Sequence, residues 1–390
     1  MANLTSEGAT PPRTPRPTVV ARLAARSSLP PPQTNGRMAP AKPALERGSS
    51  RRASRLLKHL RVLIGVGVSV ALFVYLLRSV DLRELGRQLA MTQWWWVVPA
   101  VAVAPLGLWA RAIRWRYLFP PGSKPPGLVA ANMIGYMANN VLPLRAGEFV
   151  RVYIVARRLT RPGGSLGGGL WLAGATLVVE RVLDSLTLIL ILAILVFFIP
   201  VPPALQYAAA FVLAVDALAA AVLISLAVAP DRSRRFVARV SQRWPRVKAP
   251  ATRVIDMVLR GLEGIRTRAH LVPLAAWTVL AWVLPALGAW TLFHAVHLEL
   301  PVLAGWTVLT FVGFGVSIPS APGYVGVWHA ASVLALSMFG VSQAAALGYA
   351  LLYHASQFVP ITLIGWLFLV REHVTLGEAT RARSVERPVA

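Results

Sequence analysis

The chain alternates between long apolar stretches and short basic segments. Several stretches contain no Asp, Glu, Lys or Arg, namely 62–77, 88–110, 125–144, 185–215, 271–293, 300–328, 330–353 and 355–370. Because about 20 apolar residues in a helix cross a bilayer, several of these stretches qualify as spans. They lack the two-residue alternation of a membrane β-barrel. The pattern therefore predicts an all-α, polytopic integral membrane bundle.

A polar segment, 139–151, is broken by Pro143 and Gly147 and begins within the last residues of the apolar stretch 125–144. Its candidate site residues are Asn139, Asn140, Arg145, Glu148 and Arg151. A charge at the bilayer centre costs roughly 2.5–3.5 kcal/mol, so we expect these groups to face a protein-lined cavity. Glu148 lies three residues from each arginine, so the three side chains can share one helical face. The segment is either an anion site, in which arginine forks and asparagine amides bind phosphate oxygens, or a structural ion-pair cluster.

The distribution of positive charge predicts the topology. Residues 1–61 contain twelve Lys or Arg and two Glu, and 231–268 contain eleven basic and three acidic residues. Both regions should be cytoplasmic. If 125–144 crossed completely, the basic stretch 145–161 would lie outside. We therefore expect a re-entrant element here, whose broken backbone lines a cavity. We divide the chain into a disordered basic tail (1–55), a transmembrane domain (56–372) and a cytoplasmic tail (373–390).

A second broken element is predicted near residue 320, and the alternative is a plain turn between two helices. Pro319, Pro322, Gly323 and Gly326 interrupt the last apolar stretches, and Pro319 to Gly323 repeats the Pro-x-x-x-Gly spacing of Pro143 to Gly147. Paired breaks in two halves are typical of a transporter site near the bilayer midplane. His329 and His354 lie in adjoining apolar stretches, either as pocket residues or as hydrogen-bonded core histidines.

Three further charges lie between apolar stretches. Glu180 and Asp184 are four residues apart, and Arg181 can reach Asp184. We expect Arg145 or Arg151 to pair with one of these carboxylates. The alternative is an interfacial cluster whose side chains extend to the headgroup region.

The composition of the chain excludes several other kinds of binding site. The formal charge is +25, but the basic residues lie in loops and tails, which favours membrane topology over nucleic-acid binding. The chain has no cysteine, so disulfides and thiolate metal sites are excluded. We find no metal-ligand motif, nucleotide fingerprint or secretory signal peptide, and we expect no cofactor.

These motifs, in this order, resemble the lysylphosphatidylglycerol synthase transmembrane family, also called flippase-like domain proteins. The motifs are Asn139-Asn140, Pro143-x-Arg145-x-Gly147-Glu148-x-x-Arg151, Glu180-Arg181-x-x-Asp184, Pro319-x-x-Pro322-Gly323-x-x-Gly326 and Gly340-Val341. The resemblance covers roughly 60–370 and implies an inner (plasma) membrane protein with about eight membrane segments. Family members often carry an acid at the position of His329 and an arginine at that of His354, so the headgroup is expected to differ here.

The resemblance implies that the chain is a lipid flippase or transporter rather than an enzyme. In two-domain members a separate soluble domain performs aminoacyl transfer, and we expect no such domain here. The substrate would be an anionic or aminoacylated phospholipid, a hopanoid or a polyprenyl-linked lipid. The alternatives are a membrane-embedded transferase and an accessory subunit of a separate transferase.

Overall fold

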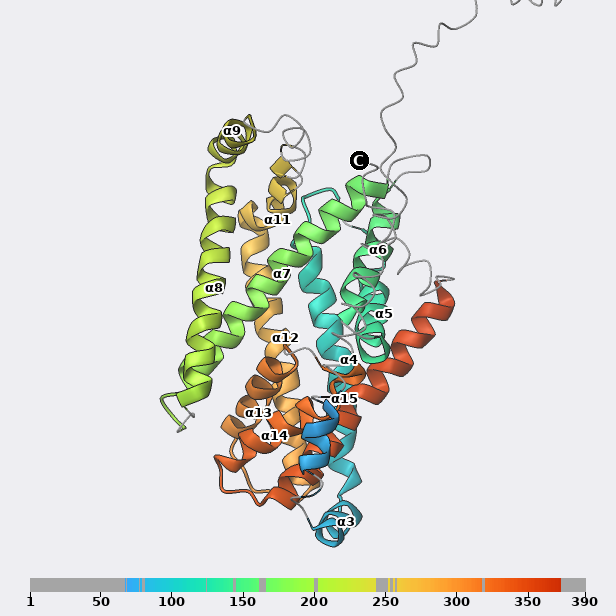
Figure 1. Ribbon diagram of the computed structural model, residues 1–390. Helices are drawn as coiled ribbons and strands as arrows, with labels where there is room; N and C mark the ends of the chain where they lie inside the picture. Colours follow the sequence, from blue (N-terminus) through green and yellow to red (C-terminus); the bar gives the residue numbers. More distant parts are fainter. Residues whose placement is uncertain are drawn as a thin grey trace, which may run out of the picture. The chain divides into compact units, whose positions relative to one another are not determined.

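The computed structural model describes 67, 69–76, 78, 81–123, 125–142, 145–160, 166–199, 203–242, 252, 255–256, 258–317 and 320–372. The tails 1–55 and 373–390, together with Pro143 and Pro319, lie outside these residues. All elements that can be assigned in the described part are helices (Figure 1), which confirms the all-α class. They are α3 (Leu82–Ala90), α4 (Trp94–Arg116), α5 (Leu128–Val141), α6 (Gly147–Leu159), α7 (Leu166–Leu195), α8 (Pro203–Val228), α9 (Pro230–Ser241), α11 (Glu263–Arg266), α12 (Arg268–Ala295), α13 (Val302–Gly315), the 3-10 turn η2 (Pro322–Tyr324), α14 (Val327–Ser337) and α15 (Gln343–Arg371).

Three of the described helices are long and apolar enough to cross a membrane by themselves. These are α4, α12 and α15, with 23, 28 and 29 residues. A fourth span is possible if the apolar part of α8 and the strongly bent α9 are counted together. The expected number of about eight membrane segments is therefore not confirmed.

The first predicted break separates two short helices, α5 and α6, of 14 and 13 residues. Each is shorter than the roughly 20 residues that a span needs. The Arg158 guanidinium near the end of α6 donates to the carbonyl of Gly127, just before α5, at 2.6 Å. At the other end, the Asn139 side chain accepts a hydrogen bond from the Gly147 backbone N–H at 2.8 Å. The two helices therefore form an antiparallel hairpin, as expected for a re-entrant element.

The second break joins α13 and α14, of 14 and 11 residues, into another hairpin. A Cβ built at Gly315 would lie 3.1 Å from the Cβ of Ala331, so the two helices pack closely. The chain between them includes η2, and both Gly323 and Gly326 have positive φ angles, of 69° and 85°. Residues with a Cβ rarely adopt this backbone conformation, which explains why glycine occupies both positions. The structure thus contains two broken elements, in agreement with the sequence.

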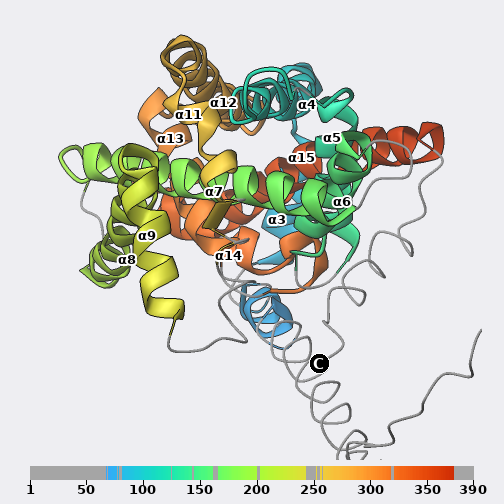
Figure 2. The ribbon, with the colours of Figure 1, turned by 90° about the horizontal axis from the view of Figure 1, so that it is seen from above.

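The long helices α4, α12 and α15 support both hairpins. α4 and α12 lie side by side in two perpendicular views (Figures 1 and 2). A Cβ at Gly107 of α4 would lie 3.4 Å from the ring of Pro285 in α12. Tyr349 of α15 donates its hydroxyl hydrogen to the Ala289 carbonyl of α12 at 2.7 Å. Asn140, at the end of α5, donates to the Thr362 hydroxyl of α15 at 2.9 Å, which ties the first hairpin to this framework.

Candidate functional site

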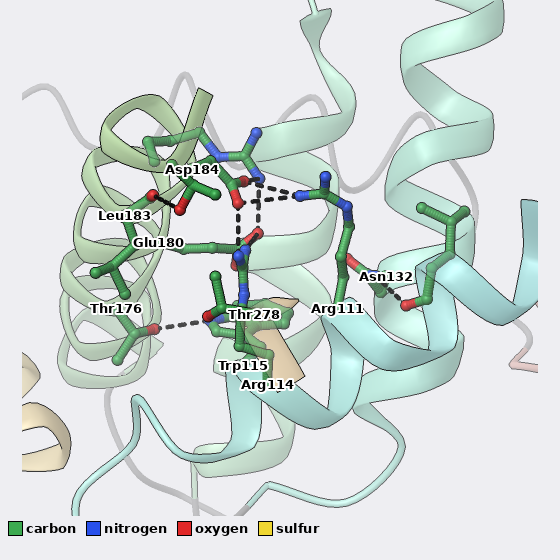
Figure 3. Close-up of polar contacts among 12 residues, drawn as sticks. Arg111, Arg114, Trp115, Asn132, Thr176, Glu180, Leu183, Asp184 and Thr278 are labelled. Carbon is green, nitrogen blue, oxygen red and sulfur yellow. Dashed lines mark hydrogen bonds and ion pairs between the residues drawn. The ribbon is translucent and has the colours of Figure 1, made fainter. Parts of the chain in front are cut away.

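A cluster of seven charged side chains joins α4, α6 and α7. We call it the charge cluster, and it consists of Arg111, Arg114, Glu148, Arg151, Glu180, Arg181 and Asp184. Asp184 forms ion pairs with two arginines of α4 (Figure 3). Arg114 lies 2.6 Å and Arg111 3.0 Å from its carboxylate oxygens. Because these groups are 70 or more residues apart, they hold α4 against α7.

Glu180 forms the buried centre of the cluster. One of its oxygens lies 2.6 Å from Arg181, 3.0 Å from Arg151 and 3.5 Å from Arg114. Its side chain is 0 % exposed, as is that of Arg114, and Arg151 is 1 % exposed. A buried charge is tolerated only when partners compensate for the loss of water. The three arginines supply that compensation, and the expected pairing of Arg151 with a carboxylate of α7 is confirmed.

Neutral side chains fix the orientation of the buried arginines. Arg151 donates to the side-chain oxygen of Asn132 at 2.7 Å, and Asn132 donates to the Leu108 carbonyl at 2.9 Å. The Arg151 guanidinium also lies over the Trp115 ring, 4.8 Å from its centroid. Trp115 in turn donates to the Thr176 hydroxyl at 3.0 Å (Figure 3). These contacts hold Arg151 between α4, α5 and α7.

Arg145 does not join this cluster. The prediction that Arg145, Glu148 and Arg151 share one helical face is therefore wrong. Arg151 and Glu148 do pair, at 3.1 Å. Arg145, however, precedes the first turn of α6 and has a positive φ of 53°. Within the part of the chain that the structure describes, no carboxylate lies within ion-pair distance of Arg145, and its buried Nε has no hydrogen-bond partner. Arg145 lines a cavity instead.

The two asparagines of the first break have structural contacts as well as a place beside the cavity. Asn139 uses its side-chain oxygen to accept from Gly147, which satisfies one N–H at the start of α6. Asn140 uses its amide nitrogen to bind α15. Both residues nevertheless line the same cavity as Arg145.

The histidines of the second break support its backbone. The His354 Nε2–H donates a hydrogen bond to the carbonyl oxygen of Gly323 at 2.8 Å. The Gly326 N–H donates to the Nδ1 of His329 at 3.2 Å. The two rings lie 4.9 Å apart, at 79° to each other. His354 lines the cavity and is therefore a pocket residue. His329 is 2 % exposed and is a hydrogen-bonded core histidine.

The cavity has a volume of about 360 Å³ and a lining of both polar and apolar groups. Charged and polar residues of the lining include Arg111, Asn139, Asn140, Arg145, Arg181, Asp184 and Tyr324. Its apolar residues come from α4, α7, α12, α13 and α15, among them Leu108, Leu188, Trp282, Val312 and Phe358. Such a cavity can hold a molecule that has both a polar and an apolar part.

The cavity lies near the middle of the three long helices. It is lined by 104–111 of α4, by Trp282 and Pro285 of α12, and by 353–361 of α15. Each set falls close to the centre of its helix, between apolar residues that pack toward the two ends. If these helices cross a bilayer, the cavity is at the membrane midplane.

The sequence did not single out Arg111, Arg114 and Asn132 as site residues. Arg111 and Arg114 come at the end of an apolar stretch, where basic residues are typical of membrane topology. Their spacing of three residues, which places both on one helical face, was the signal that could have identified them. Asn132 gave no signal beyond being an amide in an otherwise apolar stretch.

Comparison with known proteins gives one match. The family model described as the lysylphosphatidylglycerol synthase TM region matches residues 62–365. No curated protein and no solved structure matches the chain. The matched region contains both broken hairpins, the charge cluster and the cavity. Among the described residues, no group of three His, Asp or Glu side chains is arranged to hold a metal ion.

Proposed function

The chain belongs to the lysylphosphatidylglycerol synthase TM-region family, and from this premise we propose that it is a lipid flippase or transporter. It would move an anionic or aminoacylated phospholipid, a hopanoid or a polyprenyl-linked lipid between leaflets. The family and the apolar helices indicate a multi-pass membrane protein with a lipid-related function. We further propose that it resides in the inner (plasma) membrane with both termini cytoplasmic, because the basic segments 1–61 and 231–268 follow the positive-inside rule.

The observation that carries this proposal is the cavity at the centre of the long helices, whose lining contains both arginines and apolar side chains. A lipid headgroup crossing a bilayer must leave water, and its phosphate needs charged or hydrogen-bonding partners on the way. Arg145 and Arg181 offer guanidinium groups in the lining, and guanidinium forks suit phosphate oxygens. The apolar residues of the lining would contact the first part of the acyl or prenyl chain.

The charge cluster would form the rigid wall of this path. Its four arginines and three carboxylates leave one surplus positive charge, and Arg145 adds another. The buried members pair with one another, so they stabilise the wall. The more exposed Arg181, at 34 %, and Arg145 face the cavity and would contact the substrate.

The transferase alternative has less support. A general base needs a carboxylate or imidazole that is free to take a proton from the substrate. Asp184 is the one carboxylate among the described residues that line the cavity, and arginines occupy both of its oxygens. His354 is the one imidazole among them, and its Nε2 is hydrogen-bonded to the Gly323 carbonyl. A separate transferase remains a candidate partner, for which a flippase would deliver or remove the lipid.

Reconstitution tests the proposal directly. Purified protein is placed in vesicles that contain fluorescently labelled phosphatidylglycerol, and a membrane-impermeant quencher reports the fraction of label in the outer leaflet. We expect wild type to make almost all of the label accessible, and Arg145→Gln to slow this by at least about tenfold, a loss of about 1.4 kcal/mol.

Arg157→Gln is the matched control, since Arg157 is exposed on the same hairpin and lies outside the cavity. It should translocate lipid at the wild-type rate. If wild type moves none of a panel of phospholipids and polyprenyl phosphates, or if Arg145→Gln moves them as fast as wild type, the proposal fails.

A further inference from the structure

We infer that the cavity selects a lipid whose headgroup is a net anion with a neutral polar remainder, and that it rejects headgroups that carry an ammonium group. This inference rests on the proposed function in taking the ligand to be a lipid. It narrows that function, because aminoacylated lipids would not be substrates of this chain.

The first argument is the balance of charge at the cavity wall. Three guanidinium groups line it, those of Arg111, Arg145 and Arg181. The carboxylate of Asp184 is the one acidic group among the described lining residues. It accepts hydrogen bonds from Arg111 and Arg114, and it lies 3.3 Å from Arg181. A substrate ammonium would therefore find cations beside it and no carboxylate free to pair.

The other two acids of the charge cluster do not change this balance. Glu180 is completely buried and is shared by three arginines. Glu148 lies 3.1 Å from Arg151 and 3.6 Å from Arg181, and it is outside the cavity lining. To release either carboxylate for a ligand, a buried arginine would have to lose its partner, which is strongly unfavourable.

The second argument concerns the aromatic rings, which can bind an ammonium group through their faces. The Arg111 guanidinium already lies over the Trp282 ring, 5.1 Å from its centroid. The Trp328 ring is stacked against His354, at 5.3 Å between centroids and 26° between planes. The two indole rings of the cavity, the ring type that binds cations best, therefore already have a partner.

The remaining polar groups of the lining are neutral. They are amides, hydroxyls and one imidazole: Tyr136, Asn139, Asn140, Ser185, Ser317, Tyr324, Tyr353, His354 and Gln357. The Gln357 amide nitrogen is buried and has no hydrogen-bond partner within the described part of the chain. A buried donor without a partner is costly, so a ligand oxygen in the cavity would be stabilised there. Hydroxyls and ester oxygens next to a phosphate have this chemistry.

Binding to the full-length protein in detergent tests the selectivity independently of transport. The probes are dihexanoyl phosphatidylglycerol and dihexanoyl lysyl-phosphatidylglycerol, whose short chains keep them soluble. We expect phosphatidylglycerol to bind at least about tenfold more tightly than the lysyl ester. Equal affinity, or tighter binding of the lysyl ester, would overturn the inference.

A substitution that adds the missing carboxylate should reverse the preference. Gln357→Glu changes the charge with almost no change of shape, and we expect it to shift the affinity ratio toward the lysyl ester by about tenfold. Gln93→Glu adds the same charge at an exposed position at the start of α4, outside the cavity, and should leave the ratio unchanged. An unchanged ratio in a folded Gln357→Glu protein would contradict the inference.

Transport measurements separate this inference from the proposed function. If phosphatidylglycerol binds preferentially but no lipid is translocated, the selectivity stands and the flippase proposal fails. If both lipids are translocated at the same rate, the flippase proposal stands and the selectivity fails.

Discussion

At the residue scale, the closest contact in the first hairpin depends on the absence of a side chain. A Cβ at Gly147 would overlap the Gly135 carbonyl oxygen and lie 2.6 Å from the Asn139 side-chain oxygen. Gly147→Ala should therefore force α5 and α6 apart and lower the free energy of unfolding by about 1–3 kcal/mol. Thermal unfolding of the purified protein in detergent measures this.

Gly174→Ala is the comparison for that change, because a Cβ on this residue in α7 would meet nothing within 4 Å. Alanine is the better helix former by about 0.5–1 kcal/mol, so this variant should be at least as stable as wild type. If both alanine variants unfold at the same temperature, the tight approach of the two helices is not required for stability.

The buried centre of the charge cluster gives a second prediction at this scale. Glu180→Gln keeps the shape of the side chain but leaves Arg114 and Arg151 buried without their shared carboxylate. Removing one partner of a buried ion pair typically costs about 3–5 kcal/mol, so we expect a large fall in the unfolding temperature.

The equivalent change on the surface should have little effect. Glu84 forms an exposed pair with Arg87 on α3, at 3.0 Å, and water screens such pairs. Glu84→Gln should therefore unfold close to wild type. A Glu180→Gln protein as stable as Glu84→Gln would show that the arginines of the cluster are compensated in another way.

At the scale of helices, the sequence predicted the breaks better than the contacts between distant segments. Pro, Gly and clustered charge after an apolar stretch are local signals, and they located both hairpins. The pairing of Arg111 and Arg114 with Asp184 depends on how α4 packs against α7, and nothing in the local sequence encodes it. For the same reason the sequence placed Arg145 on a helical face, whereas the first turn of α6 begins two residues later.

The re-entrant arrangement of α5 and α6 can be tested by labelling, since the chain has no cysteine of its own. Two exposed residues are replaced by cysteine. Pro121 lies just before the hairpin, and Arg157 lies near its end. If the hairpin enters and leaves on one side, a membrane-impermeant maleimide should label both from the cytoplasmic face.

A cysteine replacing Arg83 provides the reference for the opposite face. Arg83 is exposed on α3, at the far end of the long helix α4, and should be labelled only from outside. Labelling of Pro121→Cys and Arg157→Cys from opposite sides would show instead that 125–144 crosses the membrane completely.

At the scale of the whole molecule, the position of the cavity suggests which parts must move. The end of α5 in the first hairpin, next to Asn140, lies against the second break, and α15 contacts both. A Cβ at Gly323 would lie 3.4 Å from the Asn140 carbonyl oxygen, and Asn140 also binds Thr362 of α15. Asn140 is itself part of the cavity lining. A lipid that passes between the first hairpin and α15 would have to separate these contacts.

This arrangement predicts that a covalent link between the first hairpin and α15 stops translocation. The Asn140 amide nitrogen lies 2.9 Å from the Thr362 hydroxyl oxygen, so the two side chains point toward each other. Cysteines at both positions are therefore to be oxidised, and formation of the disulfide is checked first by the loss of free thiols. Translocation in vesicles should then fall to background and recover on reduction. The two single-cysteine proteins should show no response to the oxidant. If the oxidised double variant instead translocates lipid as fast as the same protein after reduction, this prediction fails. That result would mean that the path opens elsewhere, and that the hairpin and α15 move as one body.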